Sequence, residues 1–245
     1  MERFLSLIVA VLFCLGAWEM ISYVTLLPGV WPVVLEFRNY CLSNSFAVDM
    51  LYSWSRILMS FVLSVSIGLV FGLISGYGGF VGDVVLRTGD LFRPVPAISF
   101  LPVVSLIFTN INLCILVVIL IGGVFPIFVS VSTGLRNVSS VRLIRVGESF
   151  CAVKRQLFWK IKVPLALKAL SIGVQTSSGT IWTVLVTAEM LSGKGGLGYK
   201  TWESYTLLNY PGVMVGMILI GISGYVLNVV VGMLFRKLFG GFYVE

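Results

Sequence analysis

Polar side chains interrupt an apolar stretch at residues 165–191, and they are the strongest candidates for chemistry in this sequence. At helical spacing, Ser171, Gln175 and Ser178 share one face, while Thr176, Thr180, Thr183 and Thr187 share another. Such groups can hydrogen-bond a passing solute, or they can bond carbonyls of their own or neighbouring helices. We expect one face to line a solute path. The candidate path residues are Gln175, Ser171, Ser178 and Thr183.

Two acidic residues also fall within apolar stretches. Glu189 lies near the end of the same stretch, and Glu19 near the end of the first one. An ionisable residue inside a membrane segment indicates function by default. We expect Glu189, with the nearby Gly196 and Gly198, to form an outer gate or a structural hydrogen bond. No Lys, Arg or His lies at the centre of a stretch, so a fixed positive charge for an anionic solute is not predicted.

The residue types that enzymes and metal sites need are scarce. The sequence contains no His, and its four Cys form neither a C-x-x-C pair nor a Cys/His cluster. Residues 193–201 superficially resemble a phosphate-binding loop, but the G-K-[ST] tripeptide is missing. We therefore predict no ATP site, cofactor or metal on this chain, and an intramembrane enzyme is disfavoured.

The composition indicates that membrane helices position these residues. Of 245 residues, 58% are hydrophobic and 11% are charged, whereas soluble domains average about 25% charged. A bilayer core of about 30 Å needs about 20 apolar residues per helix. The sequence predicts an all-α membrane protein with a single transmembrane domain over residues 1–245. Its six predicted spans are 4–27, 57–75, 94–108, 113–134, 165–191 and 213–235, of which the third, with three prolines, is expected to be broken or short.

The basic residues predict the orientation of these spans. With the N-terminus inside, 13 of the 17 Lys and Arg residues fall on the cytoplasmic side, as the positive-inside rule requires. Both termini are therefore expected in the cytoplasm of a multi-pass protein of the inner or plasma membrane. The net charge of +7 is thus assigned to topology, and no nucleic-acid partner is predicted.

The cytoplasmic loop 135–164 is the most informative segment, with seven basic residues and one acid. Ser139 or Ser140 can cap a helix that starts near Val141. Apolar residues then repeat at helical spacing: Val146, Phe150, Val153, Leu157 and Ile161. By composition alone, this amphipathic stripe could lie on anionic lipid or dock on a cytoplasmic partner.

The end of this loop, Ile161-Lys162-Val163-Pro164, resembles the I-x-L-P end of the EAA loop of binding-protein-dependent ABC importer permeases. The family pattern is E-A-A, three residues, G, nine residues, then I-x-L-P. Counting back from Pro164 places Cys151 at the Gly position and Arg145-Val146-Gly147 at E-A-A. The spacing is kept, while the acid has become Arg and the Gly has become Cys. The family Gly permits a turn with positive φ, where Cys151 would cost about 1 kcal/mol.

Three further blocks resemble the nitrate, sulfonate, taurine and pyrimidine-precursor branch of these permeases. They are FRPVP with FLP at residues 92–102, AEML with GLGY at residues 188–199, and SWSRILMSF at residues 53–61. The resemblance covers the chain from about Pro28 onward. The branch's W-F-G-x-G after the third span is absent, since residues 109–112 read TNIN.

The resemblance implies a type I ABC importer permease fold and a set of partners. The loop would form a coupling helix in a cleft of an ATPase subunit. Two permease copies, expected as a homodimer, would work with two ATPases and an extracytoplasmic solute-binding protein that docks on the outer loop at residues 193–211. The implied coupling residues are Arg145, Val146, Gly147, Cys151, Leu157, Ile161 and Pro164. The implied solute is a small organic or inorganic anion, such as a sulfonate or nitrate, or a pyrimidine-type compound.

Two other interpretations stay open. A secondary transporter would need ionisable groups at mid-membrane and usually an internal repeat, and neither is evident in this sequence. A degenerate permease that couples weakly to its ATPase would account for the altered EAA loop.

Overall fold

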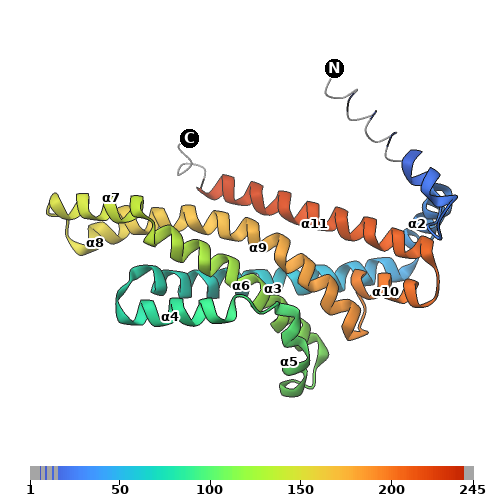
Figure 1. Cartoon of the computed structure of the whole chain (residues 1–245), viewed down its shortest axis with the longest axis horizontal. Coiled ribbons are helices and arrows are strands. Elements are labelled where there is room, and N and C mark those ends of the chain that lie inside the picture. The colour runs from blue at the N-terminus through green and yellow to red at the C-terminus, as the bar shows by residue number, and fades with distance from the viewer. Residues whose placement is uncertain (1–5, 7–8, 10–12, 14–15, 240–245) are drawn as a thin grey trace. The chain divides into compact units, whose positions relative to one another are not determined.

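A computed structural model of the chain describes residues 6, 9, 13 and 16–239 (Figure 1). Every regular element in this part is a helix, which confirms the all-α class. After a helical segment at residues 16–22, the longer helices are α2 (Val30–Cys41), α3 (Asn44–Tyr77), α4 (Gly79–Phe92), α6 (Ile111–Arg136), α7 (Val138–Ser149), α9 (Val163–Ser192), α10 (Leu197–Thr206) and α11 (Tyr210–Phe239). Short pieces are η1 (Ala97–Phe100), α5 (Leu101–Ile107), α8 (Lys154–Leu157) and η2 (Phe158–Lys162).

Within the described residues, three helices are long and apolar enough to cross a membrane: α3, α6 and α11. A fourth crossing is added if α4 and η1–α5 count as one span, which bends by 90°. Helix α9 occupies the fifth predicted stretch but does not reach the same hydropathy, because Ser, Thr and Gln residues interrupt it. Of the first predicted span, 4–27, the structure describes residues 6, 9, 13 and 16–27, and the helix in its second half ends at residue 22.

Helices α2, α4 and α10 were not predicted, and α3 begins 13 residues before the predicted start of its span. All three missed helices are short and carry charged residues. A search for long apolar stretches therefore passes over them. The bend between α4 and α5 falls at Pro94 and Pro96, where the ring of proline prevents a continuous helix.

The chain forms two compact units, which are described separately. Unit 1 comprises Met1–Ser53 and Glu189–Gly221, and unit 2 comprises Trp54–Ala188 and Ile222–Glu245. The divisions fall inside α3, α9 and α11. Unit 1 therefore contains α2 and α10, while unit 2 contains everything from α4 to α8.

A seam between α3 and α6 forms the centre of unit 2. The hydroxyls of Ser60 and Ser64 donate to the carbonyls of Leu116 and Leu120, each 56 residues further along the chain. The constant separation shows that the two helices run parallel. Further along the seam, small residues of α3 admit large side chains of α6: an added Cβ at Gly72 would lie 2.7 Å from Val131. Hydroxyl bonds and close glycine contacts are typical of helix association in membranes.

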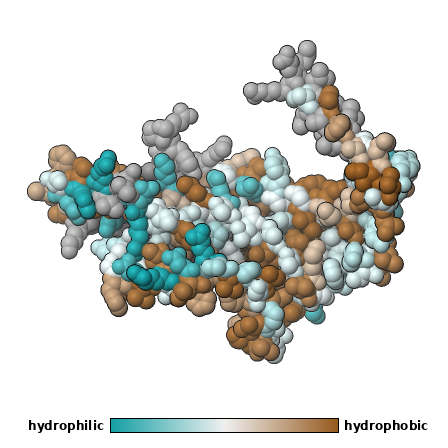
Figure 2. Space-filling model, in the orientation of Figure 1, coloured by the Kyte–Doolittle hydropathy of each residue, from teal (hydrophilic) through white to brown (hydrophobic). Residues whose placement is uncertain are grey.

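The hydropathy of the surface of unit 2 changes along its length. Figure 2 shows hydrophilic residues gathered over α4, α7 and α8, and hydrophobic residues over α5. The charged loop between α6 and α9 thus lies at one end of the unit, apart from the hydrophobic residues over α5.

Candidate functional site

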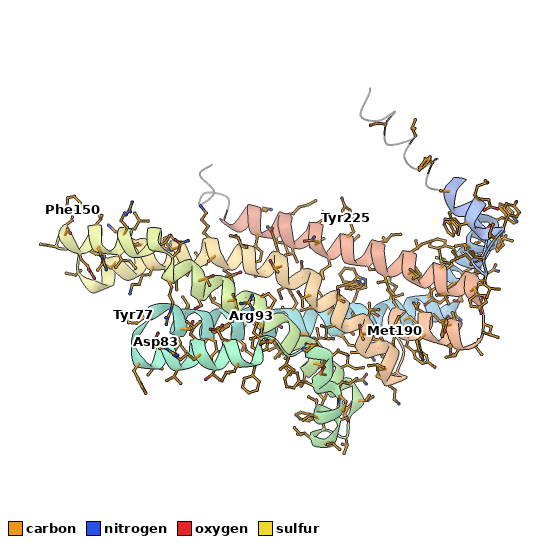
Figure 3. All side chains as sticks on the ribbon, in the orientation of Figure 1. Tyr77, Asp83, Arg93, Phe150, Met190 and Tyr225 are labelled. Atoms are coloured by element: carbon orange, nitrogen blue, oxygen red, sulfur yellow. The ribbon has the colours of Figure 1, made fainter. Side chains whose placement is uncertain are left out.

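The loop that resembles the EAA segment folds as a hairpin, in which α7 is followed by a turn at residues 150–153 and then by α8. Figure 3 shows Phe150 at the free end of this hairpin. Its side chain is 82% exposed, and Val153 across the turn is 60% exposed. The prediction of one continuous apolar stripe from Val146 to Ile161 is wrong, because the chain reverses direction in the middle of it.

The turn of the hairpin is a Schellman motif. The Ala152 amide donates to the Gly147 carbonyl at 3.1 Å, and the Cys151 amide donates to the Glu148 carbonyl at 2.9 Å. Cys151 has a φ of 58°, the left-handed conformation that glycine usually provides at this position. The turn is therefore kept although the residue that favours it is absent.

Three of the predicted coupling residues form the inside of the hairpin. An added Cβ at Gly147 would lie 2.6 Å from Leu157 and 2.9 Å from Ile161, so α7 packs directly on α8 and η2. Leu157 is only 7% exposed. Arg145 and Val146 instead face solvent. The hairpin thus has a packed interior and presents its basic and apolar groups outward.

The second arm of the hairpin continues into α9 through the widened π-helical turn η2. Pro164 is the second residue of α9. Its ring cannot donate to the carbonyl four residues earlier and would clash with it in a regular α-helix, and a widened turn relieves this conflict. At the start of α8, the Gln156 side chain accepts from the Val153 amide at 3.2 Å, as in a capping box.

An open cavity of about 580 Å³ lies within unit 2. One of its walls is the threonine face of α9, made by Thr176, Thr180, Thr183 and Thr187. The other walls come from the segment Arg93–Ile98 and from α6 around Pro126. We call this space the threonine cavity. Its volume lies within the range of small-molecule sites.

The other polar face of α9 does not line this cavity. Ser171 and Ser178 are almost fully buried, and the Ser178 hydroxyl bonds the Gln175 carbonyl at 2.7 Å and Asn228 at 3.3 Å. Gln175 is exposed and is not among the lining residues of the cavity. Of the four candidate path residues, Thr183 is the one that the structure places on the cavity wall.

In unit 1, three side chains bind the first turn of α10, and we call this group the α10 cap. Glu189 is fully buried and accepts hydrogen bonds from the Ser53 hydroxyl at 2.9 Å and the Gly198 amide at 3.0 Å. The Ser53 oxygen in turn accepts from the Leu197 amide at 2.9 Å, and Asp49 accepts from the Gly196 amide at 3.1 Å. Unpaired amides and the helix dipole make a helix N-terminus favourable for carboxylates.

The geometry of the α10 cap explains why glycine stands at position 196. Gly196 has a φ of 117°, and an added Cβ would overlap the Glu189 carboxylate. On the other side of the cap, the Tyr40 hydroxyl donates to Asp49 at 2.7 Å. Burial, together with this bond to Asp49, raises the pKa of the Tyr40 phenol far above its ordinary value. Tyr40 thus remains a protonated donor.

Comparison with known proteins identifies the family. The family described as "Binding-protein-dependent transport system inner membrane component" matches residues 68–240, which is more than half of the chain. The protein belongs to this family. It is therefore a multi-pass membrane component of a transport system, as the composition and helices indicate.

The relatives of this inner membrane component include permease proteins named for aliphatic sulfonates and for nitrate. It is 26% identical over 233 residues to a putative aliphatic sulfonates transport permease protein of Bacillus subtilis, which covers 95% of this chain and 84% of the relative. It is 25% identical over 223 residues to a nitrate import permease protein of Synechococcus elongatus, which covers 84% of this chain and 78% of the relative. These matches confirm the resemblance to the nitrate and sulfonate branch.

The fold of the inner membrane component also matches a solved structure. A chain of the MetNI methionine ABC transporter, in an inward-facing conformation, superposes with a TM-score of 0.62 at 20% identity. The match covers 78% of this chain and 95% of that chain. The type I importer permease fold is thereby confirmed.

Sequence reasoning missed three residues that the structure brings to these sites. Asp49 and Ser53 join the α10 cap from α3, and Arg93 lines the threonine cavity. Ser53 and Arg93 lie within segments that resemble other permeases, but the resemblance gives neither residue a role. Their roles could not be predicted from spacing, because Glu189 lies 136 residues after Ser53 and the threonine wall lies more than 80 residues after Arg93.

Proposed function

We propose that this chain is the translocating subunit of an ABC importer for a small anion, coupled through the α7–α8 hairpin to a separate cytoplasmic ATPase. In this proposal two copies of the chain and two ATPase subunits form the transporter, and a solute-binding protein delivers the solute from outside. The excess of basic residues in the hairpin supports a cytoplasmic position for it and for both termini.

The observation that carries the proposal is the form of the hairpin. Its interior is packed through Gly147 and Leu157, and its turn is closed by two backbone hydrogen bonds. A rigid element of this kind can transmit a displacement to α9, which follows it without a break. Its exposed surface combines the apolar Phe150 at the free end with the basic Arg142 and Arg145 along α7, an amphipathic surface that a partner cleft with acidic rims would bind.

The threonine cavity supplies the path in this proposal, with Thr183 at its wall. Glu189, Gly196 and Gly198 have a structural role as part of the α10 cap, since both oxygens of the buried carboxylate accept hydrogen bonds from residues of unit 1. An anionic solute is supported by the relatives that are named for sulfonate and nitrate transport.

Removal of the exposed aromatic group at the hairpin end tests this proposal. We expect Phe150→Ala to weaken retention of the ATPase during purification from native membranes at least tenfold, since aromatic anchors at interface centres dominate binding energy. Trp202→Ala removes an exposed aromatic from α10 and should leave retention unchanged. Solute uptake should also cease when ATP is depleted.

Two results would overturn the proposal. One is uptake that persists without ATP and follows an ion gradient, which would indicate a secondary transporter. The other is equal ATPase retention by the Phe150→Ala variant and the unchanged chain. Retention of the ATPase with ATP turnover that is independent of solute would indicate a weakly coupled permease, and would contradict the rigid coupling inferred from the hairpin.

A further inference from the structure

The charge of Arg93 distinguishes the threonine cavity from an ordinary polar groove. Arg93 follows the last residue of α4, and its backbone amide donates to the Gly89 carbonyl at 2.9 Å. Among the described residues that line the cavity, it is the one charged side chain. The side chain is exposed, and within the described part of the chain no carboxylate lies in ion-pair contact with it. Figure 3 shows Arg93 where α4 ends.

The threonines opposite Arg93 are not free donors. Each hydroxyl of Thr176, Thr180, Thr183 and Thr187 donates to the carbonyl four residues earlier in α9, at 2.9–3.2 Å. With their hydrogens engaged in this way, these side chains present lone pairs and methyl groups to the cavity. The threonine wall therefore offers acceptors, and Arg93 offers both the positive charge and its fork of N–H donors.

The remaining walls are apolar except for Ser130 of α6. Val95 and Ile98 come from the segment after α4, Phe125 and Val129 from α6, and Val184 from α9. A cavity with one cation, a row of acceptors and mostly apolar walls matches a solute of complementary polarity. Such a solute has an anionic head group, a short apolar body and, where present, a donor group.

We propose that Arg93 binds the anionic head group of a small organic anion, such as an alkanesulfonate, as it passes through the threonine cavity. This inference rests on the proposed function and names the solute class for its path. Planar guanidinium groups bind oxyanions through paired N–H bonds. A single such contact, open to water, gives the weak and reversible binding that a transport path needs.

Charged thiol reagents test the inference on the intact chain in membrane vesicles. Thr183→Cys places a thiol on the cavity wall, and labelling of the native cysteines is subtracted with the chain that lacks this change. The probes are 2-sulfonatoethyl methanethiosulfonate, an anion, and 2-trimethylammonioethyl methanethiosulfonate, a cation. The measured quantity is the ratio of their labelling rates at the introduced thiol of the Thr183→Cys chain, with Arg93 unchanged or replaced.

We expect Arg93→Gln to lower the anion-to-cation ratio about tenfold, because a unit charge acts oppositely on the two reagents. Arg93→Lys should keep most of the preference for the anion. The matched control is Arg87→Gln, which removes a charge from an exposed position of the same helix that does not line the cavity. Its ratio should equal that of the parent.

Each outcome has a distinct meaning. An unchanged ratio in Arg93→Gln would overturn the inference, and would leave Arg93 as a cation at the C-terminus of α4, where it interacts favourably with the helix dipole. Absence of labelling by both reagents would instead contradict the threonine cavity as the path. A lowered ratio in both Arg93→Gln and Arg87→Gln would show a general surface charge effect and would also overturn the inference.

Discussion

Two turns, one in each unit, contain a residue with positive φ but differ in whether that residue can carry a side chain. In the hairpin of unit 2, Cys151 adopts a φ of 58° at an exposed position. In the α10 cap of unit 1, Gly196 adopts a φ of 117° beside a buried carboxylate. A side chain is tolerated in the first turn because it points to solvent, whereas in the second it would overlap Glu189.

The difference lies in what else depends on the turn. The hairpin turn is closed around Cys151 by two backbone hydrogen bonds, and a Cβ there adds a cost of about 1–2 kcal/mol. The α10 cap joins a strained turn to a buried acid, a hydroxyl and three backbone amides. A substitution at Gly196 is therefore expected to change the stability more than one at Cys151. Substitutions at both turns measure the difference.

The largest expected effect is that of Gly196→Ala. The φ of 117° with a ψ of 170° lies in a region that is nearly exclusive to glycine, and the new Cβ must displace the Glu189 carboxylate. We expect a loss of about 3 kcal/mol, seen as a fall of about 6–12 °C in the unfolding temperature in detergent. The control is Gly193→Ala, at a φ of 65° with no neighbouring atom within 4 Å, which should cost about 1 kcal/mol. Equal losses in the two variants would refute the role assigned to Glu189.

A smaller effect is expected from Glu189→Gln, which keeps the size of the side chain. The carboxylate accepts from the Ser53 hydroxyl with both oxygens and from the Gly198 amide with one. An amide group replaces one acceptor by a donor, so one buried bond is lost, at about 2 kcal/mol. Thermal unfolding in detergent checks this against Glu203→Gln, whose bond to Lys200 lies on a partly exposed helix face and contributes about 0.5 kcal/mol or less.

The same two turns show which parts of the structure could be predicted from the sequence and which could not. The resemblance of residues 145–164 to the EAA loop places Cys151 where the family has a glycine that permits a positive φ, and in the structure Cys151 has a φ of 58°. The spacing within the loop is local, so the pattern itself contains the turn. In contrast, Asp49 and Ser53 bind amides 144–147 residues further along the chain, and no periodicity connects them. Helices were predictable where they are long and apolar, and α2, α4 and α10 were not.

The smallest effect is expected at Cys151, and it has the opposite sign to that at Gly196. Cys151→Gly removes the left-handed strain at the C′ position of the Schellman motif but adds flexibility to the unfolded chain, for a net gain of up to about 1 kcal/mol. Cys151→Val adds a β-branch at the same φ and should destabilise the turn. The readout is hydrogen exchange of the Ala152 amide, which bonds the Gly147 carbonyl. Its protection should increase from Val to Cys to Gly, and protection that is equal in all three would show that the turn is set by the packing of Gly147 on Leu157 instead of by the residue at 151.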